Sequence, residues 1–364
     1  MVNENKGARI VMAVSNDMLT DQRIMRHVAA LSEAGYEVDT VCRTDLPVRW
    51  QRGWRFYAAF NWRLWRRIKS EVNSGKYGIV WANDADTLLG CWLAAHGRCK
   101  LVMDAHELFP EVPEIQEKPL VKWVWRTIER RLMPKCDALI TVCQSIADYY
   151  KAHYGVQMTV VRNLPACGED TEIQESYGFM DCAKRESEKL LLYAGKVNVG
   201  RGVDWAIDAM EWLPECRLVI AGDGDLLEEM KAYAAQKAWN DRVEFTGRLM
   251  PEAMAALTAK ADVGLVMLED KGLSYHFALP NRVGTFVQAG VPMVVSDLPE
   301  MARVVRTFGV GAVMERQGTL GLVDAVKAVL ARNWKDEDFA AARENMDWNK
   351  EKQKLIDICY TICC

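Results

Sequence analysis

A glycine-bounded turn with two cations is the segment of this sequence whose chemistry is easiest to infer. It is Ala194-Gly195-Lys196-Val197-Asn198-Val199-Gly200-Arg201-Gly202, which follows an apolar run and precedes a helical pattern. The N-terminus of a helix exposes unpaired N–H groups and a positive dipole end, and both favour phosphate. Lys196 would add a point charge, and Arg201 a guanidinium that can bind phosphate through two N–H groups. An ordinary turn with two solvated cations is the alternative.

Two further segments have the same strand-to-helix character. Gly222-Asp223-Gly224 lacks a third glycine at dinucleotide spacing, so it favours a tight connection in which Asp225 caps the next helix. Pro280 suits the first turn of a helix that ends at Gly290. That helix would point at the same crevice as the one beginning near Gly202, and the two helix ends could hold a diphosphate without a metal.

One acidic pair has the spacing of a metal site. Asp84-Ala85-Asp86 nevertheless falls at a predicted helix start, where Asp86 would cap N–H groups and both acids suit the helix dipole. No metal is therefore expected.

Strands and helices must position these residues, and both are predicted along most of the chain. In the first half, apolar runs predict strands at Arg9–Ser15, Val38–Arg43, Gly78–Ala82, Lys100–Asp104, Ala138–Val142 and Thr159–Arg162. In the second half they predict Lys189–Ala194, Arg217–Ala221, Arg242–Thr246, Val263–Leu268, Met293–Ser296 and Gly311–Met314. Continuously apolar strands indicate burial on both faces and hence parallel sheets. Their alternation with helical segments such as Arg23–Ala34, Thr87–His96 and Val121–Met133 predicts doubly wound α/β domains.

The order breaks once, between Pro165 and Glu188, where Gly, Glu and Ser are frequent. We therefore expect a Rossmann-like domain over residues 1–165, a linker over 166–188 and a second Rossmann-like domain over 189–335. Residues 336–364 are expected to be helical and to pack back toward the N-terminal domain. Two such sheets would direct their carboxyl ends toward a shared cleft, where open α/β sheets bind ligands.

Composition argues against several classes of protein. The formal net charge of −4 does not suit a general nucleic-acid binder, so no nucleic-acid partner is expected. Eleven dispersed cysteines, with no CxxC pair and no zinc-ligand spacing, are typical of reduced thiols in a cytoplasm. No signal peptide precedes the first predicted strand, and no apolar run approaches the roughly 20 residues that span a bilayer. We expect a cytoplasmic protein.

A basic and aromatic stretch lies between Arg49 and Lys69. It contains seven Arg or Lys residues and no acid, interleaved with tryptophans. On a helix from Asn61, Trp62 and Trp65 would share a face with Ile68, opposite the arginines. That face either packs on the sheet or binds an anionic membrane at the inner face, as suits an enzyme with a lipid-linked acceptor. Lys118–Lys135 has a similar composition, with Trp123 and Trp125.

Taken together, the motifs resemble the family 4 glycosyltransferases of GT-B fold. The resemblance in the second half rests on the Gly195–Gly202 turn, the Gly222-Asp223-Gly224 turn, the strand leading to Gly247, and Leu279-Pro280-Asn281-Arg282…Ala289-Gly290-Val291-Pro292. In the first half it rests on Thr20-Asp21-Gln22-Arg23, Asn83-Asp84, Asp104-Ala105-His106-Glu107, Ile128-Glu129-Arg130 and Val161-Arg162-Asn163-Leu164-Pro165. It covers about Ile10 to Leu330.

The resemblance implies a retaining transferase that moves a sugar from a nucleoside diphosphate (UDP, GDP or ADP) to the hydroxyl of a glycan or lipid-linked acceptor. Such an enzyme would serve the synthesis of cell-surface polysaccharide or glycolipid. Lys196 and Arg201 would bind the diphosphate, and His106 would hydrogen-bond the transferred sugar. The remaining donor-binding residues implied by the resemblance are Gly195, Gly202, Asp223, Arg248, His276, Pro280, Asn281, Arg282 and Thr285.

One departure from the family concerns the sugar. The family carries two glutamates, eight residues apart, that hold sugar and ribose, and this chain has Phe277 and Thr285 at those positions. A threonine hydroxyl binds ribose more weakly than a carboxylate does. His276 or Asn281 is expected to take the sugar contact. An epimerase on the same scaffold and a non-catalytic nucleotide-sugar-binding protein stay open as alternatives.

Overall fold

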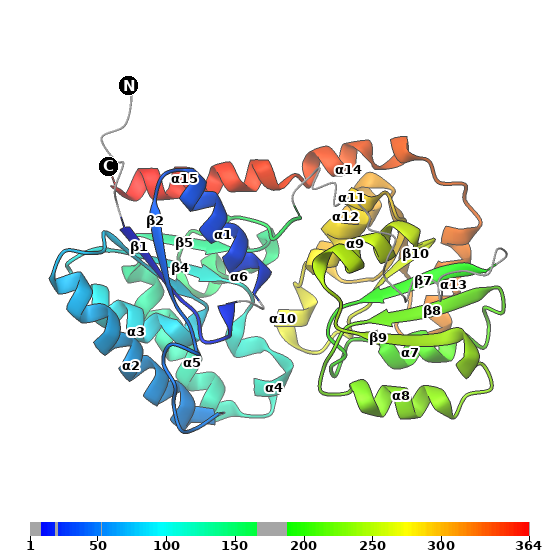
Figure 1. Ribbon diagram of the computed structural model, residues 1–364, viewed down its shortest axis with the longest axis horizontal. Helices are drawn as coiled ribbons and strands as arrows, with labels where there is room; N and C mark the ends of the chain where they lie inside the picture. Colours follow the sequence, from blue (N-terminus) through cyan, green and yellow to red (C-terminus); the bar gives the residue numbers. More distant parts are fainter. Residues whose placement is uncertain (1–8, 19–20, 52, 166–187, 364) are drawn as a thin grey trace. The chain divides into compact units, whose positions relative to one another are not determined.

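Strands and helices alternate along the whole described chain (Figure 1). The computed structural model describes residues 9–18, 21–51, 53–165 and 188–363. Thr20, Arg52 and nearly all of the expected linker over 166–188 lie outside these residues. The chain forms two compact units. The first comprises Met1–Asn163, Gly272–Ser274 and Asn349–Cys364, and the second comprises Leu164–Lys271 and Tyr275–Trp348.

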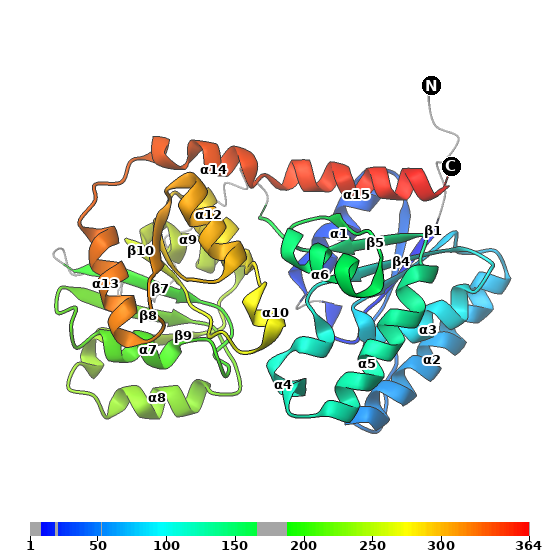
Figure 2. The same ribbon diagram turned by 180° about the vertical axis from the view of Figure 1, so that it is seen from behind.

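The first unit contains a six-stranded parallel sheet in the order β2-β1-β3-β4-β5-β6. Its strands are β1 (Arg9–Ala13), β2 (Glu37–Val41), β3 (Ile79–Asn83), β4 (Lys100–Ala105), β5 (Ala138–Thr141) and β6 (Thr159–Val160). Its helices are α1 (Gln22–Glu33), α2 (Gly53–Asn73), α3 (Ala85–Ala95), α4 (Pro113–Gln116), α5 (Pro119–Leu132), α6 (Gln144–Tyr154) and α15 (Trp348–Cys363). Helix α3 packs against both α2 and α5, as the view from behind also shows (Figure 2).

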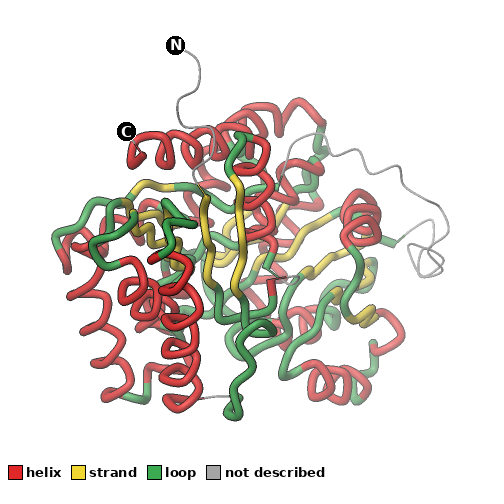
Figure 3. Tube along the Cα trace, turned by 60° about the vertical axis from the view of Figure 1, so that its left-hand side comes forward, coloured by secondary structure: helices red, strands yellow, loops and turns green. Residues whose placement is uncertain are grey.

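The second unit contains a parallel sheet in the order β12-β11-β10-β7-β8-β9. Its strands are β7 (Lys189–Ala194), β8 (Cys216–Ala221), β9 (Val243–Gly247), β10 (Val263–Val266), β11 (Met293–Ser296) and β12 (Gly311–Met314). Its helices are α7 (Val203–Ala209), α8 (Leu227–Ala235), α9 (Pro251–Lys260), α11 (Asn281–Ala289), α12 (Pro299–Phe308), α13 (Thr319–Leu330) and α14 (Ala340–Asn345), while the short α10 (Gly272–His276) spans the division between the units. Helices and sheet strands can be followed in Figure 3. The expected class, two doubly wound parallel α/β sheets, is confirmed.

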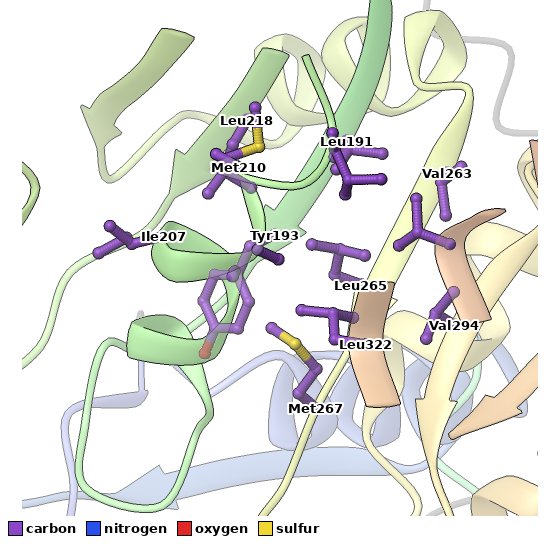
Figure 4. Close-up of a cluster of buried hydrophobic side chains, with 14 of the residues drawn as sticks. Leu191, Tyr193, Ile207, Met210, Leu218, Val263, Leu265, Met267, Val294 and Leu322 are labelled. Carbon is purple, nitrogen blue, oxygen red and sulfur yellow. The ribbon is translucent and has the colours of Figure 1, made fainter. Parts of the chain in front are cut away.

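Strand β7, after its exposed first residue Lys189, shows why successive positions of a buried strand are apolar. Leu191 and Tyr193 belong to the core on one face of the sheet, together with Leu218 and Leu265 (Figure 4). Leu190 and Leu192 belong to the core on the other face. Because successive side chains of a strand point to opposite faces, a strand covered on both sides must be apolar throughout.

Helix α2 differs from its prediction. It begins at Gly53 rather than Asn61, and its buried side chains include Phe60, Leu64 and Ile68 at four-residue spacing. Trp62 was expected to share a face with Ile68 but is 52% exposed, beside Arg66. Helix α2 packs against α3, and the stripe of Phe60, Leu64 and Ile68 is buried while Trp62 is not, so the helix is rotated relative to the predicted face.

The C-terminal segment over 336–364 was expected to be helical, and its described residues form several helical pieces. A 3₁₀ turn at Asp336–Phe339 leads to α14, and the chain leaves helical geometry at Met346 before α15 begins at Trp348. Phe339 and Met346 are buried in a core of the second unit, whereas Asn349–Cys364 belongs to the first. No helix among the described residues is long and apolar enough to cross a membrane.

Helices α5 and α6 meet around a buried acid. Glu129 is 1% exposed and accepts hydrogen bonds from the hydroxyls of Tyr150 (2.8 Å) and Tyr154 (3.1 Å). Burial raises the pKa of Glu129 to about 8, although the two tyrosine hydrogen bonds oppose the shift. At neutral pH the folded protein therefore holds this carboxyl protonated.

Replacement Glu129→Gln should make the protein less sensitive to rising pH. Between about pH 4.5 and 8 the unfolded chain ionises this group while the folded chain keeps the proton, so the free energy of unfolding falls as pH rises, by up to about 1.4 kcal/mol per pH unit. The neutral amide removes this contribution. The melting temperature of Glu129→Gln relative to the unaltered protein should climb from pH 5 to pH 8, while the exposed control Glu228→Gln should follow the unaltered protein. A constant difference across this range would contradict the buried-proton interpretation.

Candidate functional site

The first unit gathers polar groups where its sheet changes direction. Strand β1 lies between β2 and β3, so the connections after β1 and β3 depart to opposite sides and leave a crevice at the carboxyl ends of those strands. Ser15, just after β1, donates a hydrogen bond to the buried carboxylate of Asp86, in the first turn of α3. Asp86 therefore does not cap α3 as expected. Asp84 is the N-cap residue, and its side chain makes no capping bond.

Asp84 instead holds His106. Its Oδ1 accepts the backbone N–H of His106 at 2.7 Å, and its Oδ2 lies 3.3 Å from Nδ1 of the imidazole. Asp84 is the one described non-glycine residue with positive φ, and its φ of 61° and ψ of 168° lie in a region that residues other than glycine rarely adopt, so this conformation costs free energy. The strained backbone places the carboxylate under the end of β4.

Asp104, the next buried acid, is surrounded by cations. Arg23 donates from Nε and Nη2 to its two carboxylate oxygens at 2.9 and 2.6 Å. Nε2 of His106 and Nδ1 of His27 each lie 3.4 Å from Oδ2. A fully buried carboxylate requires such compensation, because an unpaired one would be very costly to desolvate.

The two histidines of this network differ in charge. Burial, then Arg23, keeps the pKa of His27 well below its usual value, so His27 is neutral. Burial also acts to lower the pKa of His106, but Asp84 and Asp104 outweigh it and raise the pKa to about 9. At neutral pH His106 is an imidazolium: a cationic hydrogen-bond donor that cannot accept a proton as a general base.

A pocket of about 520 Å³ opens beside this network. It lies at the carboxyl ends of β1 and β2 and is lined by Ser15, Asn16, Arg43, Gln51, Gly53, Phe56 and Tyr57. Arg43 stacks over Phe56, with 4.6 Å from Cζ to the ring centroid. Hydroxyl, amide and guanidinium groups around an aromatic floor are the groups that bind a polyhydroxylated ligand.

In the second unit, the turn after β7 rests on the turn after β8. A Cβ at Gly222 would overlap the carbonyl oxygen of Gly195, and one at Gly224 would overlap that of Val197. Val197 N–H donates to Asp223 O at 2.8 Å, and Leu226 N–H to Val197 O at 3.0 Å. Asp225 does not cap α8, whose N-cap is Leu226. Its N–H binds the Asn198 side chain instead, because Asn198 is part of the interlocked turn.

Three cations lie at these turns. Lys196 pairs with Asp223 at 2.6 Å, and this bond lowers the pKa of Asp223, with a smaller contribution from Arg248. Arg201 stacks over Tyr275 (4.8 Å), and its buried Nε has no hydrogen-bond partner among the described residues. Arg282 stacks over Tyr193 (4.8 Å).

The guanidinium of Arg282 fills the space where Gly195 lacks a Cβ, with Nη2 2.7 Å from that position. Its buried Nη1 has no hydrogen-bond partner among the described residues. Such buried N–H groups are costly unless an acceptor reaches them.

The turn also lies where the second sheet changes direction, between β7 and β10. The N–H of Glu269, beyond β10, donates to the carbonyl of Gly200 at 2.9 Å. Gly202 is the N-cap of α7. Pro280 was expected in the first turn of α11, but it is the N-cap and the helix begins at Asn281.

The other residues predicted to bind the nucleotide-sugar donor have different surroundings. Arg248 is exposed, and His276 Nδ1 lies 3.0 Å from Asp270. Thr285 donates its hydroxyl to the carbonyl of Asn281 within α11. The Asn281 amide makes no hydrogen bond among the described residues, so it is freer than Thr285 to bind a ligand.

Sequence reasoning missed the aromatic partners of the two arginines. Tyr275 lies 74 positions beyond Arg201 and Tyr193 lies 89 positions before Arg282, so no local pattern could have linked them. It also gave no role to Arg23, whose position in the motif Asp21-Gln22-Arg23 was the only available signal.

The comparisons with known proteins agree with this architecture. Residues 21–164 match the family model Glycosyltransferase Family 4, and residues 188–332 match Glycosyl transferases group 1. The chain belongs to the glycosyltransferases of GT-B fold, and it is an enzyme of that class.

Among curated relatives, Alpha-D-kanosaminyltransferase of Streptomyces kanamyceticus is 23% identical over 87% of this chain and 83% of that enzyme. Phosphatidyl-myo-inositol mannosyltransferase of Mycobacterium leprae is 27% identical over 48% of this chain and 47% of that enzyme.

Solved structures resemble almost the whole chain. Sucrose-phosphate synthase from Thermosynechococcus elongatus has a TM-score of 0.78 at 16% identity, covering 98% of this chain and 99% of that one. Anabaena Alr3699/HepE in complex with UDP and glucose has a TM-score of 0.73 at 13% identity, covering 97% and 100%. At these identities the likeness establishes the fold.

Replacement Gly222→Ala should separate the two turns of the second unit. The new methyl group would overlap the Gly195 carbonyl, so the turn carrying Lys196 must move and stability should fall by roughly 1 to 3 kcal/mol. Gly309→Ala is the matched control: it has φ 66° and open space around it, so only backbone strain of about 1 kcal/mol is added. Thermal unfolding compares the two, and equal losses would mean that the interlock tolerates a methyl group.

Replacement Asp84→Asn should lower the pKa of His106 from about 9 toward its ordinary value near 6.5, because it removes one of the two carboxylates that stabilise the imidazolium. Asparagine has nearly the same shape as aspartate, so the replacement should add little backbone strain to that already present at this position. Titration of the imidazole by nuclear magnetic resonance measures the shift, with the exposed Asp297→Asn as control. An unchanged His106 pKa would exclude Asp84 as its charge partner.

Proposed function

We propose that this enzyme is a retaining glycosyltransferase that moves a sugar from a nucleoside diphosphate to an acceptor hydroxyl, in the synthesis of cell-surface polysaccharide or glycolipid. The observation that carries the proposal is the set of cations at the interlocked turns of the second unit. Lys196, Arg201 and Arg282 lie there, and each of the two arginines has a buried N–H group with no hydrogen-bond partner in the described part of the chain. The related fold that binds UDP and glucose and the named transferases support the same donor class.

The diphosphate would be bound by charge and by backbone. Arg201 and Arg282 are held by stacking on Tyr275 and Tyr193, so their guanidinium groups lose little freedom when phosphate binds. Lys196 would exchange its exposed contact with Asp223 for a phosphate oxygen, an exchange of low cost at a surface pair. The N–H groups at the starts of α7 and α11 would add further donors.

Transfer would break the bond between the sugar C1 and the phosphate oxygen and form a bond between C1 and the acceptor oxygen on the same face. The acceptor proton would pass to the leaving phosphate oxygen, so that no protein base is required. Negative charge grows on the phosphate as the first bond breaks, and fixed cations stabilise it more in the transition state than in the ground state. No metal cofactor is needed in this scheme.

The sugar would be recognised without the family's two glutamates. Phe277 and Thr285 occupy their positions, and the Thr285 hydroxyl is already bound within α11. We assign the sugar contact to Asn281, whose amide is uncommitted among the described residues, with His276 as the second donor. His106 would donate a hydrogen bond to a sugar hydroxyl as an imidazolium, giving up one of its carboxylate contacts.

The acceptor is assigned to the 520 Å³ pocket of the first unit, where Asn16, Arg43 and Gln51 can bind hydroxyl groups. A lipid-linked glycan is the proposed acceptor, and the enzyme would work in the cytoplasm at the inner face of the membrane. The basic stretch Arg49–Lys69 would attract that surface, since Arg66 and Lys69 lie beside the rings of Trp62 and Trp65. The phosphatidylinositol mannosyltransferase named above supports a lipid acceptor.

The double replacement Lys196→Ala and Arg201→Ala should weaken nucleoside-diphosphate binding by about 100-fold or more, because each charge-assisted contact contributes roughly 1.5 to 3 kcal/mol. Isothermal titration calorimetry with UDP, GDP and ADP measures the loss and identifies the base. Lys231→Ala with Arg316→Ala removes the same charges from exposed positions elsewhere in the second unit and should bind normally. Unchanged affinity in the first variant would show that the site is misassigned.

Nucleotide release with and without acceptor tests the reaction itself. A transferase releases nucleoside diphosphate in proportion to a glycosylated acceptor, because the sugar must be passed on. An epimerase would convert its nucleotide sugar without acceptor, and a binding protein would release nothing. Either of the last two results would overturn the proposed reaction even if the nucleotide site is correct.

A further inference from the structure

Helix α5 and its neighbour α6 enclose a second concave site, away from the pocket assigned to the acceptor. A groove of about 720 Å³ lies between them. Its lining includes Trp123, Arg126, Arg130, Arg131, Tyr149 and His153. Nothing in the proposed sugar transfer uses this groove.

The groove is positively charged, and only one of its three arginines is paired with an acid among the described residues. Arg126 is bound by Glu111, with Nε 3.1 Å from its Oε1. Arg130 and Arg131 are exposed and make no ion pair or hydrogen bond among the described residues. Two adjacent guanidinium groups in a concave site are suited to bidentate binding of phosphate oxygens.

Aromatic rings complete the groove. Tyr149 and His153 stack with their centroids 4.0 Å apart, and His153 Nδ1 lies 2.8 Å from the Tyr149 carbonyl. Trp123 lies two helical turns before Arg130 on α5, so the two share a face. A phosphate bound by the arginines would therefore have an aromatic side chain beside it.

Exposed apolar side chains next to the groove favour a lipid over a soluble phosphate as its ligand. The start of α5 exposes Leu120, Val121 and Val124, with Leu120 72% and Trp123 63% exposed. An edge-to-face contact between Tyr57 and Trp125, with centroids 5.0 Å apart, joins α2 to α5, and α2 exposes Trp54 at 75%. Exposed tryptophan and aliphatic residues beside arginines are typical of surfaces that enter the interface of an anionic bilayer.

The acid on α5 does not offset this charge. Glu129 is buried against Tyr150 and Tyr154, whereas Lys122, Arg126, Arg130 and Arg131 lie on the rest of the same helix and Lys118 directly precedes it. Charge complementarity with an anionic surface is thus concentrated here, although the chain as a whole carries −4.

We propose that the groove between α5 and α6 is a binding site for the phosphate of an anionic phospholipid headgroup, on a face of the first unit that enters the bilayer interface through Trp54, Leu120, Trp123 and Val124. The acceptor site and the donor site are separate from it. The site would hold the enzyme against the membrane and give its attachment a preference for anionic lipid.

The test is flotation of the full chain with vesicles of phosphatidylcholine, with and without phosphatidylglycerol. The unaltered protein should bind only the anionic vesicles, and less at high salt. The double variant Arg130→Gln with Arg131→Gln should bind these vesicles roughly 10-fold or more weakly, since each cation near an anionic membrane adds to the free energy of binding. Arg306→Gln with Arg316→Gln, exposed arginines of the second unit, is the matched control and should bind normally.

Arg130→Lys with Arg131→Lys separates a built site from diffuse attraction. Lysine keeps the charge but not the bidentate geometry, so binding should fall several-fold below the unaltered protein. Equal binding by the glutamine variant, or full binding by the lysine variant, would overturn the headgroup site. Displacement from vesicles by millimolar glycerol phosphate alone would also overturn it, in favour of a soluble phosphate ligand.

Fold and donor binding are checked separately. Melting temperature and nucleoside-diphosphate affinity, both measured without vesicles, should match the unaltered protein in all of these variants, because the arginines are exposed and distant in sequence from the donor turns. Failure of vesicle binding would leave the proposed sugar transfer intact, and failure of sugar transfer would leave the lipid site intact.

Discussion

The proposed donor site depends on a backbone contact between two neighbouring βα turns. Gly195 and Gly222 lie so close that no side chain fits between them, and the carbonyl of Val197 meets Gly224 in the same way. This contact brings Asp223 beside Lys196. It also leaves room over Gly195 for the guanidinium of Arg282, which comes from a helix nearly ninety residues further along the chain. Glycine is required here by the approach of two backbones, as well as by the shape of either turn alone.

In the first unit, pairs of opposite charges hold the polar residues of the site in place. Asp104 is completely buried, and its ionised form persists because Arg23 binds both of its oxygens and His106 adds a second positive charge. The same carboxylate, together with Asp84, keeps His106 protonated. A histidine at the end of a strand thereby becomes a fixed cation, which suits the binding of a sugar hydroxyl and does not suit proton abstraction.

The two units of this glycosyltransferase thus use different means to place positive charge. In the second unit, aromatic rings hold two arginines, and one buried nitrogen of each has no acceptor among the residues that the structure describes. In the first unit, carboxylates hold a histidine and an arginine in a closed network. The arginines of the second unit can therefore bind an anionic ligand, because no acceptor among the described residues occupies these two N–H groups. The network of the first unit has little spare capacity, so His106 can reach a ligand only by giving up a carboxylate.

The sequence by itself determined the fold class, since apolar strands alternating with amphipathic helices allow few architectures other than doubly wound sheets. It located the strands within about two residues, and Lys189–Ala194, Met293–Ser296 and Gly311–Met314 matched in full. It also identified the glycine turns, because glycine and charge at the end of a strand are local signals. Only the tertiary structure decided which partners those residues have. The face that α2 buries carries Phe60 and Leu64, whereas Trp62 on the predicted face is exposed. Helical geometry ends at Met346, whose side chain is buried in a core of the second unit. Asp86 and Asp225 do not have the capping roles expected of them: the Asp86 carboxylate accepts from Ser15, and the Asp225 backbone N–H donates to the Asn198 side chain, partners that lie near in space but distant in sequence.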